Sequence, residues 1–482
     1  MYRNKVKNQL VFEDFYLPFG GHLNGTNRWI QLAKLVPWDE FEEQYAELFA
    51  QSGQGAPAKP FRMALGALLI KEKLNITDEE TVSQIRENPY LQFLLGMESF
   101  RDEEPFEASM MVHFRKRITG EMLSDINERI HQELVKKKQK DTPTEGEAEV
   151  TRGKLLVDAT CTPADIRYPT DLSLLNEARE KTERIITLLH QPLLGKEKKP
   201  RTYRQIARKD YLAVTKKRKP GKKAIRKGIR KQLQYIQRNL NLIQELSQKT
   251  PVSNLSNKNY RDLLVIQELY RQQNQMYKNK INSVADRIVS IHQPQVRPIV
   301  RGKASAATEF GAKLTISVVD GFVFQEKVSW DPYNEAKDLI DQIEKYKGRF
   351  GCYPESVHVD KIYRNRENRQ YCSERGIRLS GPPLGRPPKD QIMNREKARQ
   401  VRADERDRIP VEGKFGNGKR RYGLNRIMAK RADTSETVIG VTILVMNLEK
   451  ILRDLFALFF SSVKTTHISF FIPRDPVVNN AA

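Results

Sequence analysis

The sequence has few cysteines and no long hydrophobic run. Its 482 residues include only 3 cysteines, and Cys161, Cys352 and Cys372 show neither CxxC nor mixed Cys/His spacing. A disulfide framework and a structural zinc site are therefore not expected. The most apolar run, LFALFF at residues 455–460, is much shorter than a membrane-spanning helix. The amino terminus lacks the apolar core of a signal peptide, so we expect a cytoplasmic protein with no membrane segment.

Acidic residues are scarce relative to basic ones. The chain has 84 Lys and Arg against 60 Asp and Glu, which gives a formal net charge of +24. Such a charge predicts a polyanionic partner, with nucleic acid as the first candidate. A generally basic, solvated surface is the alternative, but residues 196–231 alone hold 17 Lys or Arg and 2 acidic residues. This concentration favours a dedicated surface for binding a polyanion.

The first 135 residues are expected to form an all-α domain, followed by a polar linker at residues 136–150. Residues 38–49 and 61–74 carry apolar side chains at helical spacing. Thr77 has the position of an N-cap that starts a further helix. These patterns predict a helical amino-terminal domain, in which a basic helix is the candidate for DNA binding.

A basic helix lies near the end of this helical region. Residues 109–123 place Arg115, Lys116 and Arg117 on a helix that also carries apolar residues. A helix of this kind can lie in a DNA groove. An ordinary surface helix is an equally good interpretation, and both remain open.

Residues 151–482 alternate strand and helix patterns, which predicts an α/β domain. A short strand at 155–157 is followed by a helical insertion at about 171–300, interpreted as a long antiparallel hairpin with a basic base. Asp320-Gly321 separates two β-rich runs, which is a strong hairpin signal. Asp331-Pro332 is expected to cap and open the next helix. Two further strands and helices complete the domain.

Two aspartates and one glutamate stand out in this α/β domain. Asp158 ends the strand at 155–157, and Asp360 ends a similar run at 356–359. Alone, Asp158 is more simply a turn residue, but the second occurrence favours a paired site. Adjacent strands lie about 4.8 Å apart, so the two carboxylates can share a divalent ion. Glu412, in a later helical block, supplies a third carboxylate.

Three carboxylates suit Mg²⁺ or Mn²⁺, hard cations that prefer oxygen ligands. Two such ions per site activate a water or a 3′-hydroxyl for in-line phosphoryl displacement. Arg408 and Lys419, on either side of Glu412, are expected to hold phosphates. Pro410 and Gly413 make it uncertain from sequence that Arg408 and Glu412 share one helix face.

Several nearby residues have simpler explanations than catalysis. Strand alternation puts His358 on the same face as Asp360, yet a packed core histidine is the preferred interpretation. Cys161 is interpreted as a small thiol in a strand and not as a nucleophile, because no partner histidine is near it in the sequence. Acidic residues that are more simply turn or capping residues are Asp165, Asp171, Asp320 and Asp331.

The chain resembles bacterial insertion-sequence transposases of the DDE class. The amino-terminal resemblance lies in LVPWDEFEEQYAELF and FRMALGALLIKEKL, and the catalytic resemblance in LLVDATCTPADIRYPTD, SVHVDKIYRNREN and RIPVEGKFGNGKRRYGLNRI. The family signature around its glutamate is Tyr, two residues, Arg, three residues, Glu, six residues, Lys. Arg408, Glu412 and Lys419 fit this signature, whereas Glu405 stands where tyrosine is expected. The departure leaves the carboxylate triad intact.

This resemblance implies an RNase H-like catalytic core, with Asp158, Asp360 and Glu412 as the metal-binding triad. The implied enzyme binds the inverted repeats of its own element as a homodimer on double-stranded DNA, cleaves the element ends and joins them to target DNA. It would act in the cytoplasm, at the nucleoid. The alternatives are a catalytically inactive DNA-binding repressor and a structure-specific nuclease of the same fold. The predicted DNA-binding residues are Arg408, Lys419, Arg115, Lys116, Arg117, Lys216, Lys217, Arg218, Lys219, Lys222 and Lys223.

Overall fold

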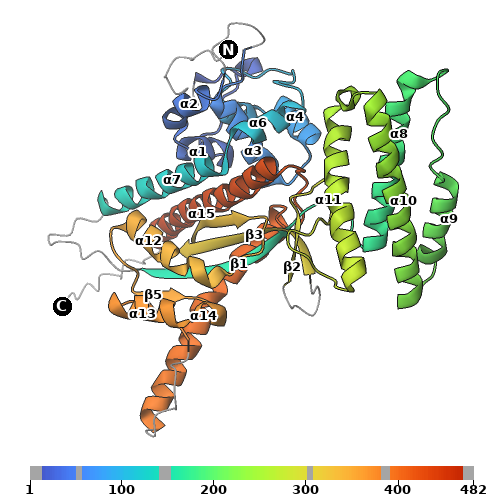
Figure 1. Cartoon of the computed structure of the whole chain (residues 1–482). Coiled ribbons are helices and arrows are strands. Elements are labelled where there is room, and N and C mark those ends of the chain that lie inside the picture. Colours follow the sequence, from blue (N-terminus) through green and yellow to red (C-terminus); the bar gives the residue numbers. More distant parts are fainter. Residues whose placement is uncertain (1–13, 50–56, 141–152, 301–307, 382–390, 470–482) are drawn as a thin grey trace, which may run out of the picture.

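The protein consists of a helical amino-terminal region, a mixed β-sheet and a group of four helices beside the sheet (Figure 1). The computed structural model describes residues 14–49, 57–140, 153–300, 308–381 and 391–469. This is the mixed α/β architecture with an all-α amino-terminal region that the sequence predicted.

Seven helices form the amino-terminal region. Their bounds are α1 Arg28–Leu35, α2 Trp38–Ala46, α3 Phe61–Leu74, α4 Asp78–Glu87, α5 Pro89–Leu94, α6 Met110–Arg117 and α7 Gly120–Lys140. As predicted, Thr77 is the N-cap of α4, and its hydroxyl accepts a hydrogen bond from the Glu80 backbone N–H. The predicted linker begins too early, because α7 continues to Lys140. The other linker residues, 141–150, lie outside the described residues.

The amino-terminal helices and the sheet share one hydrophobic core. The carboxy-terminal helix α15 (Ala432–Ser469) packs against α3, α6, α7 and strand β4, so its buried face touches both regions. A buried polar contact fixes this junction: the Asn447 amide donates to Asn127 Oδ1 and to the Val323 carbonyl. Asn447 Oδ1 in turn accepts from the Val323 backbone N–H at 2.8 Å. Paired this way, the polar groups are satisfied inside an apolar core.

The sheet has six strands in the order β2-β3-β1-β5-β6, with β4 also paired to β3. Strand bounds are β1 Lys154–Pro163, β2 Arg297–Val300, β3 Thr308–Val319, β4 Phe322–Ser329, β5 Ser356–His358 and β6 Arg378–Leu379. β1 is antiparallel to β3 and parallel to β5. Asp320 and Gly321 both have positive φ, 49° and 78°, and make the tight turn predicted between β3 and β4.

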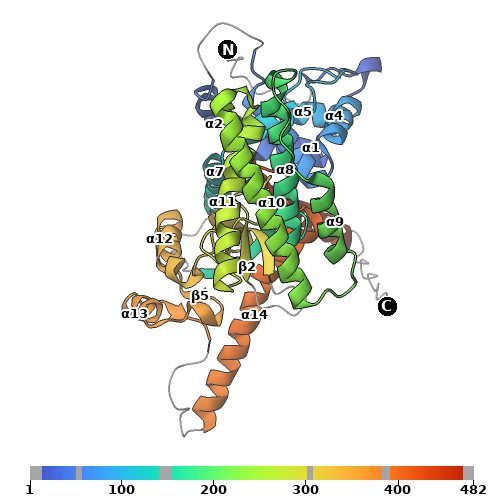
Figure 2. The ribbon, with the colours of Figure 1, turned by 45° about the vertical axis from the view of Figure 1, so that its right-hand side comes forward.

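Four helices separate β1 from the next strands: α8 Asp171–His190, α9 Arg204–Thr215, α10 Lys222–Lys249 and α11 Asn257–Asn279. They form a bundle beside the sheet, which Figure 2 shows from a second side. α10 and α11 are the two helices that the apolar spacing predicted. The predicted hairpin is incomplete, because α8 and α9 also belong to the bundle and α8 packs along α10. Leu175, Ile236 and Ile266 from three helices meet in its core.

The last part of the chain surrounds the sheet with helices. α12 (Leu339–Phe350) and α13 (Arg366–Glu374) lie near β5, and α14 (Gln391–Arg421) crosses β1 and β5. The amino-terminal half of α14 projects away from the sheet, as both Figure 1 and Figure 2 show. Within the described residues, no helix is both long and apolar enough to cross a membrane.

Candidate active site

Asp158 lies in the middle of β1, at the point where the parallel strand β5 stops pairing with it. The last β1–β5 pair is Leu156 with His358, whereas β1 continues to Pro163 along β3. The prediction that Asp158 ends its strand is therefore wrong. Asp158 still lies on the stretch of β1 that β5 no longer pairs with. Its Oδ1 accepts a hydrogen bond from the Ala159 backbone N–H at 2.8 Å.

Asp360 follows β5 by two residues and lies beside Asp158, as the two strand patterns predicted. Leu156 pairs with His358 in this parallel register, so Asp158 and Asp360, each two residues further along, occupy corresponding positions. Asp360 is also the N-cap of the short 3₁₀ helix η6 (Lys361–Tyr363), and it accepts from the Lys361 backbone N–H at 2.7 Å. Its side chain remains 57% exposed, so an N-cap role leaves one oxygen open to the solvent side.

Glu412 lies on α14, and Arg408 connects it to Asp360. The Arg408 guanidinium contacts Asp360 Oδ1 through Nη1 and Glu412 Oε1 through Nη2, both at 3.2 Å. α14 is continuous through Pro410, so Arg408 and Glu412 lie one helical turn apart on the same face. The uncertainty about this helix is thereby settled: Arg408 contacts Asp360 directly, and Glu412 is linked to Asp360 through Arg408.

Asp158 is the least solvated of the three carboxyl groups, and its environment shifts its titration. Burial raises the pKa of the Asp158 carboxyl to about 6, although the hydrogen bond from Ala159 acts in the opposite direction. Among the charged neighbours Glu335 raises this pKa most, Arg408 lowers it and Asp360 raises it. Asp158 therefore lies within the electrostatic reach of both Asp360 and Arg408.

A groove of about 1180 Å³ runs beside Asp360 and Glu412, between the end of β5 and α14. Glu405, which stands where the related sequences have tyrosine, lines this groove and is exposed. Lys419 lies two turns beyond Glu412 on α14, is half-buried and does not line the groove. The basic residues that line the groove are Lys361, Arg364, Arg399, Arg402, Arg406 and Arg408.

The donor set of the three carboxylates fits a hard divalent cation, but Arg408 now occupies the position between two of them. Within the described residues, the one group of three possible ligands whose donor atoms all lie within 4.8 Å is His358, Asp404 and Asp407. Both of these aspartates are already paired with a basic side chain, since Asp404 contacts Arg378 at 2.6 Å and Asp407 contacts Lys154 at 2.7 Å. This second cluster is therefore a partly exposed ion-pair network, because each carboxylate already has a basic partner.

His358 is a core residue, as the sequence analysis preferred. It is fully buried, and its Nε2 lies 3.0 Å from Ser356 Oγ. Burial lowers its pKa, so it is neutral at physiological pH. Both ring nitrogens lie 4.0 Å from carboxylates of α14, those of Asp404 and Asp407. His358 thus packs β5 against α14.

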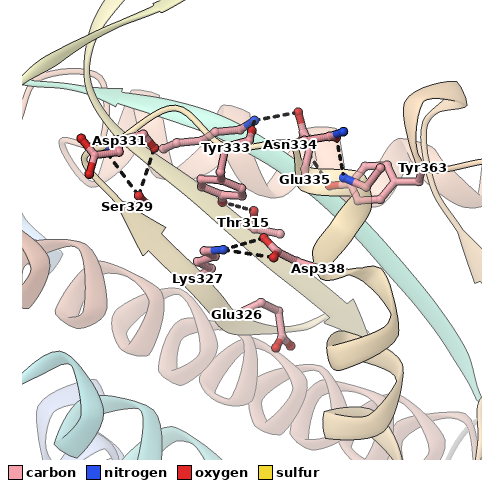
Figure 3. Close-up of polar contacts among 12 residues, drawn as sticks. Thr315, Glu326, Lys327, Ser329, Asp331, Tyr333, Asn334, Glu335, Asp338 and Tyr363 are labelled. Atoms are coloured by element: carbon pink, nitrogen blue, oxygen red, sulfur yellow. Dashed lines mark hydrogen bonds and ion pairs between the residues drawn. The ribbon is translucent and has the colours of Figure 1, made fainter. Parts of the chain in front are cut away.

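Glu335 is the acidic neighbour of this site that the sequence analysis missed. Its carboxylate accepts hydrogen bonds from Tyr363 in η6 and from Lys313 in β3, both at 3.0 Å. Figure 3 shows Glu335 beside Tyr363. Burial and Glu335 raise the pKa of Tyr363, so Tyr363 stays protonated and donates. Glu335 therefore ties the loop after Asp360 to the sheet.

A local misassignment explains why Glu335 was missed. Asp331-Pro332 does not cap the next helix. Instead, Asn334 caps the 3₁₀ helix η5 (Glu335–Asp338), with its side chain accepting from the Ala336 N–H, and α12 starts only at Leu339. Asp331 makes a turn with Ser329, as Figure 3 shows. The Asn-Glu pair was the available signal, because Asn is a strong N-cap.

The basic residues predicted on α6 fall into different environments. Arg115 is 8% exposed and forms a two-contact ion pair with Asp78 of α4. Buried and paired, it offers no group to a DNA phosphate, which corrects the prediction for this residue. Arg117 stacks on Phe49 with its guanidinium 4.5 Å from the ring centre, and Lys116 is exposed.

The basic segment of the helical bundle lies where a large ligand can reach it. Lys216 to Lys219 follow α9, and Lys222 and Lys223 open α10. All six of the predicted cations in this segment are exposed, and none has an ion-pair partner among the described residues. Cys161 is buried in β1, as expected for a structural thiol.

Comparisons with known proteins match two separate segments of the chain to transposase families. Residues 357–449 match the family described as "Transposase DDE domain", and residues 19–117 match "Transposase domain (DUF772)". The first match includes Asp360 and Glu412, whereas Asp158 lies outside it. A Rhizobium meliloti protein described as "Uncharacterized protein ORF8 in nfe locus" is 32% identical over 157 residues, 32% of this chain and 71% of the relative. No solved structure matches the chain.

Proposed function

We propose that Asp158, Asp360 and Glu412 form the catalytic triad of this chain, which belongs to the insertion-sequence transposases of the DDE class. The observation that carries this proposal is the parallel β1–β5 register, which brings Asp158 and Asp360 side by side, together with the bridge from Arg408 to both Asp360 and Glu412. The three carboxylates come from two sheet segments and one helix, and Arg408 contacts two of them and acts electrostatically on the third. In this proposal the sheet is an RNase H-like core, and α8–α11 is an insertion after its first strand.

The proposed reaction is cleavage of DNA at the ends of the element and joining of those ends to target DNA. Mg²⁺ or Mn²⁺, two ions per site, would be held by Asp158, Asp360 and Glu412 and would supply an activated hydroxyl and a stabilised leaving oxygen. Without metal, Arg408 holds the two exposed carboxylates, Asp360 and Glu412, together. The cations of the groove orient the phosphate backbone. The DNA would be double-stranded, contacted by a homodimer.

Each of the remaining predicted DNA contacts has a proposed place in this scheme. Lys116 and Arg117 of α6 are proposed to face the terminal repeats, and Lys419 to hold a phosphate beyond Glu412. The six exposed cations that follow α9 and open α10 are proposed to hold the flanking duplex. Phosphate contacts of this kind fix register without reading sequence.

The test is a cleavage and joining assay on a plasmid that carries the element with its flanking DNA. We expect Asp158→Asn, Asp360→Asn and Glu412→Gln each to lower cleavage by at least about 1000-fold, since groups that act as a unit cannot be removed singly without near-total loss. DNA binding, measured by gel shift, should persist. Asp331→Asn, a change at a largely exposed carboxylate outside the triad, is the matched control and should cleave normally.

The same assay separates the alternatives. A wild-type protein that binds the ends but never cleaves them in Mg²⁺ or Mn²⁺ is a repressor. Cleavage without joining, and without preference for the element ends, identifies a nuclease. Undiminished cleavage by all three carboxylate variants would show that the triad is misassigned.

A further inference from the structure

A groove lined with positive charge lies on the helical bundle, away from the carboxylates. It has a volume of about 780 Å³ and runs between α8, α9 and the segment that leads into α9. Its charged lining residues are Arg179, Arg184, Lys199, Arg204 and Arg208, with Glu180 and Glu183 as the acidic members. Lys199, Arg204 and Arg208 belong to the basic segment 196–231, whereas Arg179 and Arg184 come from α8, so the sequence did not show that the five lie together.

The two acidic residues of the groove are neutralised from within the bundle. Arg179 is 1% exposed and contacts Glu183 at 2.5 Å and Glu180 at 3.0 Å. Arg204, the first residue of α9, contacts the other oxygen of Glu183 at 3.1 Å. The acidic groups therefore fasten α9 to α8 and leave little negative charge to offset the outer cations of the groove.

The outer cations of the groove lack carboxylate partners. Arg184 and Arg208 are exposed, and within the described part of the chain neither makes an ion pair or hydrogen bond. Lys199 donates to the Thr187 hydroxyl at 2.9 Å, a neutral group that leaves its charge uncompensated. Like charges gathered on one face repel one another, so an arrangement without local partners favours an external anion.

The first turn of α9 adds backbone donors to the same place. The N-cap of this 12-residue helix is Tyr203, which has a left-handed conformation with φ 54° and provides no side-chain cap. The uncapped N–H groups form the positive end of a helix dipole. The Tyr203 ring lies between Arg201 and Arg238, whose guanidinium groups are 4.7 and 4.6 Å from its centre.

We propose that the α8–α9 groove is a binding site for the phosphate backbone of DNA, with Arg184, Lys199 and Arg208 as its phosphate contacts. The proposal rests on the proposed function, because it assumes that DNA is the substrate. The uncapped start of α9 supplies N–H donors, which commonly bind phosphate at helix amino termini. The site is separate from Lys216–Lys223, which follows the opposite end of α9. It holds backbone and reads no sequence.

The test neutralises the groove and measures the salt dependence of binding. The groove variant is Arg184→Gln, Lys199→Gln, Arg208→Gln, and the probe is a random duplex of about 30 base pairs. Each lost phosphate contact lowers the slope of log affinity against log salt by about 0.9, so we expect a decrease of about 2 to 3. The matched control neutralises three exposed cations of the same bundle that lie outside both the groove and residues 196–231: Lys258, Lys278 and Lys280.

The outcomes separate the groove from the proposed function as a whole. A control slope within about 1 of the wild type, beside the larger decrease in the groove variant, supports the site. A steep wild-type slope beside a groove variant that keeps this slope, or beside a control that loses as much slope as the groove variant, overturns the groove alone. A wild-type protein that fails to bind duplex at any salt overturns both. Should the groove variant melt abnormally, the single change Arg208→Glu decides instead, with an expected loss of at least about tenfold at low salt.

Discussion

The sheet and the α8–α11 bundle differ in where exposed cations are left without a carboxylate partner. Near the proposed triad, Arg408 bridges Asp360 and Glu412, and Arg378 contacts Asp404 at 2.6 Å. In the bundle, the six exposed cations that follow α9 and open α10, together with Arg184, Lys199 and Arg208 of the α8–α9 groove, have no carboxylate partner among the described residues. The cation nearest the proposed site of chemistry is therefore paired, whereas a large group of unpaired cations lies on the bundle.

This difference assigns two tasks to two regions. Paired charges hold side chains in fixed positions, which is what a reaction that depends on positioning requires. Unpaired cations release counterions when they meet phosphates, which gives affinity without sequence preference. The predictions below convert paired groups into unpaired ones, or remove the unpaired ones, to test that division.

The largest effect is expected from removing the central bridge, Arg408→Ala. Cleavage should fall about 100-fold, the scale for losing one charged group at a developing charge. Binding of Mn²⁺ without DNA, followed by electron paramagnetic resonance, should instead become tighter, because Asp360 and Glu412 lose their competing cation. Arg395→Ala, which changes an exposed arginine of the same helix that does not line the groove, is the control. Weaker Mn²⁺ binding in the Arg408 variant would show that the bridge does not compete for the metal site.

A smaller effect is expected from neutralising the unpaired segment. Lys216, Lys217, Arg218, Lys219, Lys222 and Lys223 changed together to Gln should flatten the salt slope by up to about 5. The ratio of specific to random DNA binding should stay nearly unchanged, since base edges are read elsewhere. A titration at several salt concentrations on both duplexes measures the two quantities. A lost specificity ratio would mean that this segment reads sequence.

The smallest effect concerns Asp158 and depends on pH. Burial raises its pKa from 3.8 to about 6, so the ionised carboxylate destabilises the metal-free fold. Ionisation of Asp158 therefore costs no folding stability below about pH 3.8, and the free energy of unfolding falls as the pH rises through 6. In EDTA at pH 8, Asp158→Asn should therefore melt a few degrees higher than the wild type, for at most about 3 kcal/mol. At pH 3.5 the difference should vanish. A lower melting temperature at pH 8 would contradict the burial cost.

Local patterns predicted the parts of the site that depend on neighbours in sequence. The Asp320-Gly321 turn, the Thr77 cap and the burial of His358 follow from rules that span a few residues. The adjacency of Asp158 and Asp360 was also predicted, because two similar strand patterns favour neighbouring strands. Local rules were sufficient to predict a residue's place where it depends on a nearby turn, a helix cap or a strand of similar pattern.

The errors come from contacts that sequence distance conceals. The prediction ended the strand at Asp158, whereas β1 continues because it pairs with β3. That strand follows the whole bundle in the sequence, so local patterns could not show the pairing. Arg115 was assigned to DNA because its partner Asp78 lies on another helix. Glu335 reaches Tyr363 only through the folded loop after β4. Each of these residues is defined by a tertiary partner, which composition and periodicity do not contain.

The pairing of β1 with β3 also has a consequence for how fast the protein folds. The two strands join eight residue pairs, from Leu156 with Val318 to Pro163 with Gly311, although α8–α11 lies between them in the chain. Closing so long a disordered segment carries a large entropic cost and slows folding. The bundle has hydrophobic clusters of its own, and helices with local contacts form quickly. We infer that the bundle folds first and shortens the effective separation, so that Asp158 is brought to Asp360 only in a late step.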